Sequence, residues 1–139
     1  MVSVSHNGFR ANILVIDEDP RTAQVMRRIL DESRDGRVLA VPDVLGGLRL
    51  ACQEPPAVIL LDGMMQDMDR VTGLLLLKAH PSTRIAPVVV MTPRLRPPDM
   101  EAAYRVGAHA HVLKPLQNER LTNALQAALV AGRPAAALS

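Results

Sequence analysis

The stretch Ala57-Val58-Ile59-Leu60-Leu61-Asp62 joins a continuous apolar run to a carboxylate at its end. An apolar run without polar alternation is typical of a strand that is buried on both faces of a parallel sheet. Ligands of such sheets bind at the edge where the strands end. Asp62 is therefore the first candidate for a functional residue.

Similar short apolar runs occur on both sides of this stretch, at residues 13–16, 38–41, 88–91 and 110–113. The segments between and after the runs have helical periodicity, and we expect helices within residues 23–30, 44–53, 71–79, 97–106 and 116–131. Strict alternation of strands and helices predicts an α/β fold, a doubly wound five-stranded parallel sheet with flanking helices on both faces.

Local signals mark where several of these helices begin and end. Asp43 is a candidate N-cap, and Asp69 lies in a loop or caps the following helix. Gly107 stands where a left-handed residue would end a helix.

The 139 residues of the chain suit one domain. We expect an N-terminal tail at 1–11, the domain at 12–131 and a C-terminal tail at 132–139. Cys52 is the only cysteine, so no internal disulfide can form, and a cytoplasmic location is expected. No leader-like or membrane-spanning apolar stretch occurs, which predicts no membrane contact.

Direct nucleic-acid binding is not expected. Phe9 and Tyr104 are the only aromatic residues, although binding of single strands generally relies on stacking against aromatic rings. The formal net charge of +2 is spread along the chain without a basic cluster.

Polar residues end or follow four of the five predicted strands: Asp17 and Glu18, Asp62, Thr92, and Lys114. Clustered carboxylates repel one another unless a cation lies among them, and Mg²⁺ prefers oxygen ligands. A carboxylate beside such an ion can attack phosphorus, and the transferred group then needs cationic and hydrogen-bonding partners. Lys114 and Thr92 supply these partners, so the set is coherent as a phosphoryl-transfer site.

At these positions the sequence resembles the response-regulator receiver family of two-component signalling. The matching segments lie in family order at residues 13–20, 58–69, 87–92 and 107–115. The similarity extends from about residue 12 to residue 131 and implies a flavodoxin-like receiver fold.

The resemblance implies that Asp62 is the phosphoacceptor. It also implies that Asp17 and Glu18 are the acidic pair that binds Mg²⁺ together with Asp62. The backbone carbonyl of Met64 would be a further ligand of the ion.

The resemblance also assigns the residues that respond to phosphorylation. Thr92 is similar to the switch hydroxyl, and Lys114 to the lysine that pairs with the acyl phosphate. His111 stands where the family often has a Tyr or Phe that turns inward with the Thr.

Five positions depart from the family pattern. Glu18 replaces the usual Asp, Gln66 and Arg70 replace a Pro and a Gly after the phosphoacceptor, Pro93 replaces a small residue, and His111 replaces an aromatic residue. The loop after Asp62 and the coupling between Thr92 and position 111 are therefore expected to differ from the common pattern.

The leading hypothesis is a single-domain response regulator of the chemotaxis or phosphorelay type, not an enzyme beyond self-phosphorylation and dephosphorylation. A sensor histidine kinase or phosphotransfer protein would donate the phosphoryl group. Output would pass to a downstream protein, since the chain ends soon after the last helix. A homodimer through the alanine-rich face of that helix is compatible with the sequence.

Two alternatives remain open at this stage. The departures from the family pattern motivate a second hypothesis, a receiver-like adaptor that binds a partner without being phosphorylated. The segment Asp17-Glu18-Asp19 can also be read as the Asp-x-Asp motif of a haloacid-dehalogenase-type phosphatase, in which Asp17 would be the nucleophile.

Overall fold

The computed structural model describes residues 11–30 and 36–131. Five parallel strands form one sheet in the order β2-β1-β3-β4-β5. The strands are β1 (Ile13–Ile16), β2 (Val38–Val41), β3 (Val58–Asp62), β4 (Val88–Thr92) and β5 (Ala108–Leu113). The helices are α1 (Arg21–Ile29), α2 (Val44–Gln53), α3 (Arg70–Ala79), α4 (Pro97–Arg105) and α5 (Asn118–Ala131). This arrangement confirms the predicted doubly wound fold.

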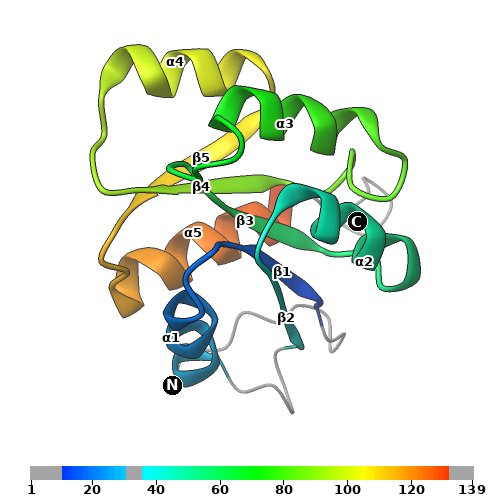
Figure 1. The fold of residues 1–139 in the computed structure, drawn as a ribbon. Coiled ribbons are helices and arrows are strands. Elements are labelled where there is room, and N and C mark those ends of the chain that lie inside the picture. The colour runs from blue at the N-terminus through cyan, green and yellow to red at the C-terminus, as the bar shows by residue number, and fades with distance from the viewer. Residues whose placement is uncertain (1–10, 31–35, 132–139) are drawn as a thin grey trace.

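The sheet lies between two layers of helices, with α1 and α5 on one face and α2, α3 and α4 on the other (Figure 1). Successive residues of β3 point to opposite faces, so Leu60 packs toward the first layer while Ile59 and Leu61 pack toward the second. Both faces are covered, which explains why the central strands are continuously apolar.

The ends of the elements largely agree with the sequence signals. The Asp43 carboxylate accepts a hydrogen bond from Gly46 N at 2.7 Å, and Asp69 accepts one from Thr72 N at 2.8 Å, so both residues cap helices. Gly107 follows α4 with φ +111°, in the left-handed region that favours glycine.

Asp62 and Thr92 are the last residues of β3 and β4, as predicted. Several other boundaries shift by one or two residues: β5 begins at Ala108 rather than at Ala110, and α5 begins at Asn118 rather than at Leu116. Leu116 is half-buried against the α1/α5 side of the core, so its apolar character reflects packing before the helix begins. The predicted tails lie outside the described residues, apart from Ala11.

The strand order reverses between β1 and β3, since the chain passes from β1 outward to β2 and returns to β3 on the other side of β1. The carboxyl ends of β1 and β3 therefore flank the crevice in which doubly wound sheets bind ligands. None of the helices within residues 11–30 and 36–131 combines the length and apolar character that crossing a bilayer requires.

Candidate functional site

Three of the predicted side chains meet at the carboxyl ends of β1, β3 and β5. Lys114 Nζ donates a hydrogen bond to Asp17 Oδ2 at 2.7 Å and lies 3.5 Å from Asp62 Oδ1. The side chains of Asp17 and Asp62 are 2% and 10% exposed, so both carboxylates are removed from most of the solvent. The fold therefore brings together residues that are far apart along the chain, from the ends of β1 and β5.

Asp17 is held by donors on both of its oxygens. Oδ1 accepts from the Asp19 backbone N–H at 2.9 Å, while Oδ2 accepts from Thr22 Oγ1 at 2.6 Å in addition to Lys114. Burial alone would raise the pKa of Asp17, but the hydrogen bonds from Lys114, Thr22 and Asp19 outweigh it and leave the pKa below its usual value. Asp17 is thus the ionised partner of the lysine.

For Asp62 the effects that raise the pKa outweigh those that lower it. Burial and the negative charge of Asp17 raise its pKa, and the backbone hydrogen bond from Met64 N at 3.0 Å and the charge of Lys114 offset this only in part. The Met64 hydrogen bond and the Lys114 contact both fall on Oδ1 of Asp62. Neither of these two contacts falls on Oδ2.

Glu18 is turned toward the loop that follows β3. It is exposed, and its Oε1 accepts a hydrogen bond from the backbone N–H of Gln66 at 3.2 Å. The longer side chain therefore reaches across the crevice to a position where the sequence already departs from the family pattern.

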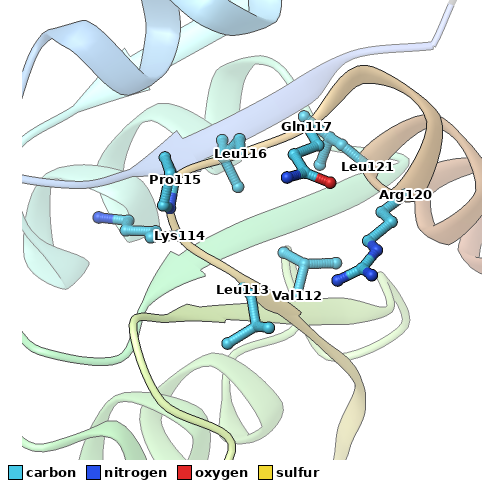
Figure 2. A pocket seen from close by; sticks show the side chains of 8 residues that line it. All are labelled: Val112, Leu113, Lys114, Pro115, Leu116, Gln117, Arg120 and Leu121. Carbon is cyan, nitrogen blue, oxygen red and sulfur yellow. The ribbon is translucent and has the colours of Figure 1, made fainter.

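Thr92 is buried at the end of β4, next to the crevice. Its hydroxyl donates to the Arg94 backbone carbonyl at 3.0 Å, so it is bonded to the β4–α4 loop. Lys114 belongs to the segment that joins β5 to α5, and its side chain points away from those of Gln117 and Arg120 (Figure 2).

His111 lies on β5 beside Tyr104 of α4, with the two rings edge-on and their centroids 4.8 Å apart. Burial, together with the positive charge of Arg70, lowers the pKa of His111. Neither ring nitrogen has a hydrogen-bond partner among the described residues. The imidazole is therefore a neutral, half-buried ring, as a packed aromatic residue would be.

Sequence reasoning missed one residue of the site, Thr22, and gave Arg70 no role there. Thr22 is buried in the first turn of α1, and its hydroxyl has the shortest hydrogen bond to Asp17. A threonine five positions after an aspartate carries no recognisable signal, because the contact depends on how α1 packs against the end of β1.

The donor set is chemically suited to a hard divalent cation. The carboxylates of Asp17, Glu18 and Asp62 and the Met64 carbonyl would supply oxygen ligands to such an ion. The charge of Asp17 already disfavours the ionised form of Asp62, and a cation would relieve this repulsion. Within the described part of the chain, no three acidic, histidine or cysteine side chains are grouped closely enough to form a ready metal cage. Glu18 in particular is directed to Gln66 N instead.

The fold and this constellation are those of a signalling receiver. Residues 13–126 match the response regulator receiver domain family, and because the match covers most of the chain, the protein belongs to that family. Aspartate phosphorylation and magnesium binding are typical of the family. Membership also removes the basis for a haloacid-dehalogenase-type phosphatase.

Curated relatives include both short and long proteins. The chain is 29% identical over 119 residues to Protein PilH of Pseudomonas aeruginosa, covering 86% of this chain and 98% of PilH. It is 32% identical over 126 residues to the transcriptional regulatory protein KdpE of Mycobacterium tuberculosis, covering 91% of this chain and 54% of KdpE. The chain thus spans nearly all of one relative and about half of the other.

Solved structures share the fold at low sequence identity. Chemotaxis protein CheY4 of Vibrio cholerae is 22% identical with a TM-score of 0.78, covering 86% of this chain and 99% of that one. The receiver domain of sensor histidine kinase PA1611 from Pseudomonas aeruginosa is 20% identical with a TM-score of 0.71, covering 88% and 99%. That structure has a magnesium ion coordinated in its active site cleft.

Proposed function

We propose that the protein is a single-domain response regulator that accepts a phosphoryl group on Asp62. The observation that carries the proposal is the position of this carboxylate, which is buried at the end of β3 with Oδ1 held by Met64 N and facing Lys114. Asp62 is thereby oriented, and Oδ2 is left for reaction.

In the proposed transfer, Oδ2 of Asp62 attacks phosphorus and forms the new P–O bond of an acyl phosphate. The bond from phosphorus to the donor breaks, and its electron pair leaves with the donor group: the imidazole nitrogen of a phosphohistidine or the carboxylate of acetyl phosphate. Lys114 would move from the two carboxylates to the phosphoryl oxygens, and Thr92 would exchange the Arg94 carbonyl for one of them.

Mg²⁺ would be held by Asp17, Glu18, Asp62 and the Met64 carbonyl, with Glu18 leaving Gln66 N. When bound, the ion neutralises negative charge on the carboxylates and on the transferring group. The proposed partners are a sensor histidine kinase or phosphotransfer protein as donor, a downstream protein as target, and a second copy of the chain in a homodimer. Because the chain has a single cysteine, we place this exchange in the cytoplasm.

The test is incubation of the chain with acetyl phosphate and Mg²⁺, followed by intact-mass measurement. We expect a mass gain of one phosphoryl group that is absent in Asp62→Asn and retained in Asp67→Asn, a matched change in the same loop. A gain that persists in Asp62→Asn would show that another residue is the acceptor.

The alternative is a receiver-like adaptor that binds a partner without phosphorylation. The contact between Glu18 and Gln66 N favours it, because this carboxylate must be released before it can bind a metal. Absence of any mass gain with Mg²⁺ or Mn²⁺, from acetyl phosphate or from a phosphohistidine donor, would support the adaptor over our proposal.

A further inference from the structure

A pocket with a net positive lining lies beside Thr92, between the loop after β3 and the start of α4. Its volume is about 470 Å³, and three arginines line it: Arg70, Arg94 and Arg96. Asp99 is the one acidic residue that also lines it. Thr92 lines the pocket as well, whereas Lys114 does not.

The single carboxylate does not balance the three guanidinium groups. Asp99 Oδ2 is 3.8 Å from Arg96 Nε, and both side chains are more than one third exposed, so this ion pair is loose. Within residues 11–30 and 36–131, the guanidinium of Arg94 makes no hydrogen bond or ion pair. Arginine side chains remain protonated at any physiological pH, so the excess positive charge is permanent.

Arg70 is the most constrained of the three arginines. Its Nη1 is buried and has no hydrogen-bond partner among the described residues, while Nη2 lies 3.8 Å from the Met64 sulfur, a weak acceptor. A Cβ atom at position 63 would lie 3.3 Å from Arg70 Cζ, so Gly63 gives the guanidinium room beside the backbone next to Asp62. A buried N–H donor without an acceptor is unfavourable, so the Arg70 guanidinium, which lines the pocket, has unused hydrogen-bonding capacity.

We propose that Arg70, Arg94 and Arg96 form an oxyanion-binding pocket, with Arg70 and Arg94 as its principal contacts. The planar guanidinium fork matches the paired oxygens of a carboxylate or phosphate, and charged hydrogen bonds of this kind are the strong ones. The ligand is therefore an oxyanion, from either a free tetrahedral anion or an acidic side chain of a partner protein. The pocket can bind in the absence of phosphorylation at Asp62.

The probes are sulfate and glutarate, each added to the full chain at constant ionic strength. Neither transfers a phosphoryl group, so binding is measured independently of the proposed function. Arginine Nε–Hε signals in nuclear magnetic resonance spectra should move and saturate for Arg70 and Arg94. We expect Arg70→Gln to weaken binding about tenfold or more, and Arg84→Gln, a change at an exposed arginine elsewhere, to leave it unchanged.

The two probes separate the sources of the oxyanion. Tighter binding of sulfate supports a free tetrahedral anion, and tighter binding of glutarate supports an acidic side chain. Arg94→Gln serves as a second variant if Arg70→Gln fails to fold. Shifts that grow linearly and equally at all exposed arginines would overturn the proposal, as would binding that survives both variants but is lost in Lys114→Met. Failure of acetyl phosphate to label Asp62 would contradict the proposed function and leave this pocket standing.

Discussion

Lys114 Nζ contacts Asp17 at 2.7 Å and lies 3.5 Å from Asp62, so one ammonium group serves two buried carboxylates. The shared lysine divides them unequally: the pKa of Asp17 is lowered, whereas that of Asp62 is raised. Asp17 thus binds the ammonium group of Lys114, and the ionised form of Asp62 is the less stabilised of the two carboxylates. This difference agrees with the proposal that Asp62, and not Asp17, accepts the phosphoryl group.

Lys114→Met should destabilise the fold, and more so at neutral pH than at acid pH. Without the ammonium, the folded-state pKa of Asp62 rises further above its unfolded value. The penalty is then full above the raised pKa and disappears as the pH falls below the unfolded value of about 3.9. We expect a loss of about 1–3 kcal/mol at pH 7, measured by urea unfolding at pH 7 and pH 4.

Arg105→Met is the control for this prediction, because it removes an exposed ion pair with Glu101. Its cost should be below about 1 kcal/mol. Equal losses at both pH values in Lys114→Met would mean that the lysine contributes through packing rather than charge.

Thr22→Val should reduce the stabilisation of the ionised Asp17 while leaving the hydrogen bond from Lys114 in place. The change removes the 2.6 Å hydrogen bond to Asp17 Oδ2 in a buried position and keeps the shape of the side chain. We expect a loss of about 1 kcal/mol in unfolding free energy and a rise in the pKa of Asp17, read from its carboxyl carbon signal. Thr22→Ser retains the hydroxyl and should keep the lowered pKa; a rise in both variants would assign the effect to packing.

The sequence was sufficient to predict the sheet, the approximate extent of the helices and the residues at the strand ends. The spacing of apolar residues, the helix cap at Asp43 and the helix stop at Gly107 depend only on nearby residues, so they can be recognised in the sequence. The parallel topology then places Asp17, Asp62 and Lys114 at the edge of the sheet where the strands end. The roles assigned to these residues came from the family resemblance and remain proposals.

Features that depend on side-chain direction could not be predicted. Glu18 bonds to Gln66 N and Thr92 to the Arg94 carbonyl, and neither choice follows from residue type or spacing. Arg70 was noted only as a departure from a common Gly. Its effect on His111 arises because α3 and β5, distant in sequence, bring the two side chains near each other.

Substitution by alanine should destabilise the fold at Gly107 but not at Gly73. Gly107 has φ +111°, and a Cβ there would lie 3.0 Å from Lys78 Cγ, so Gly107→Ala combines backbone strain with crowding. Gly73 lies inside α3, where a Cβ would be 3.4 Å from Val44 Cγ2, an ordinary contact.

We expect Gly107→Ala to cost about 1–3 kcal/mol and Gly73→Ala to be neutral or to stabilise by up to about 1 kcal/mol. Thermal and urea unfolding of the two variants would check this contrast. A stabilised Gly107→Ala would mean that the turn between α4 and β5 relaxes out of the left-handed region.

His111 should make the stability of the protein decline in mildly acid solution. Burial and the nearby charge of Arg70 lower its folded-state pKa, while the unfolded imidazole titrates near the usual value of about 6.5. As the pH falls through that value, the unfolded chain binds a proton that the folded chain does not, so the unfolding free energy decreases. Above it, both states are neutral and the residue contributes no pH dependence.

Replacing the ring with an uncharged one should remove this component. We expect His111→Phe to gain stability relative to the parent chain at pH 5.5 compared with pH 8, because phenylalanine packs against Tyr104 without a proton-binding penalty. His109→Phe is the matched control on the same strand, at an exposed position where the imidazole is open to solvent in both states. Urea unfolding across this pH range measures the difference between the variants. If the unfolding free energy of His111→Phe depends on pH as steeply as that of the parent chain, the acid sensitivity arises from other groups. Position 111 would then tolerate the charged imidazole.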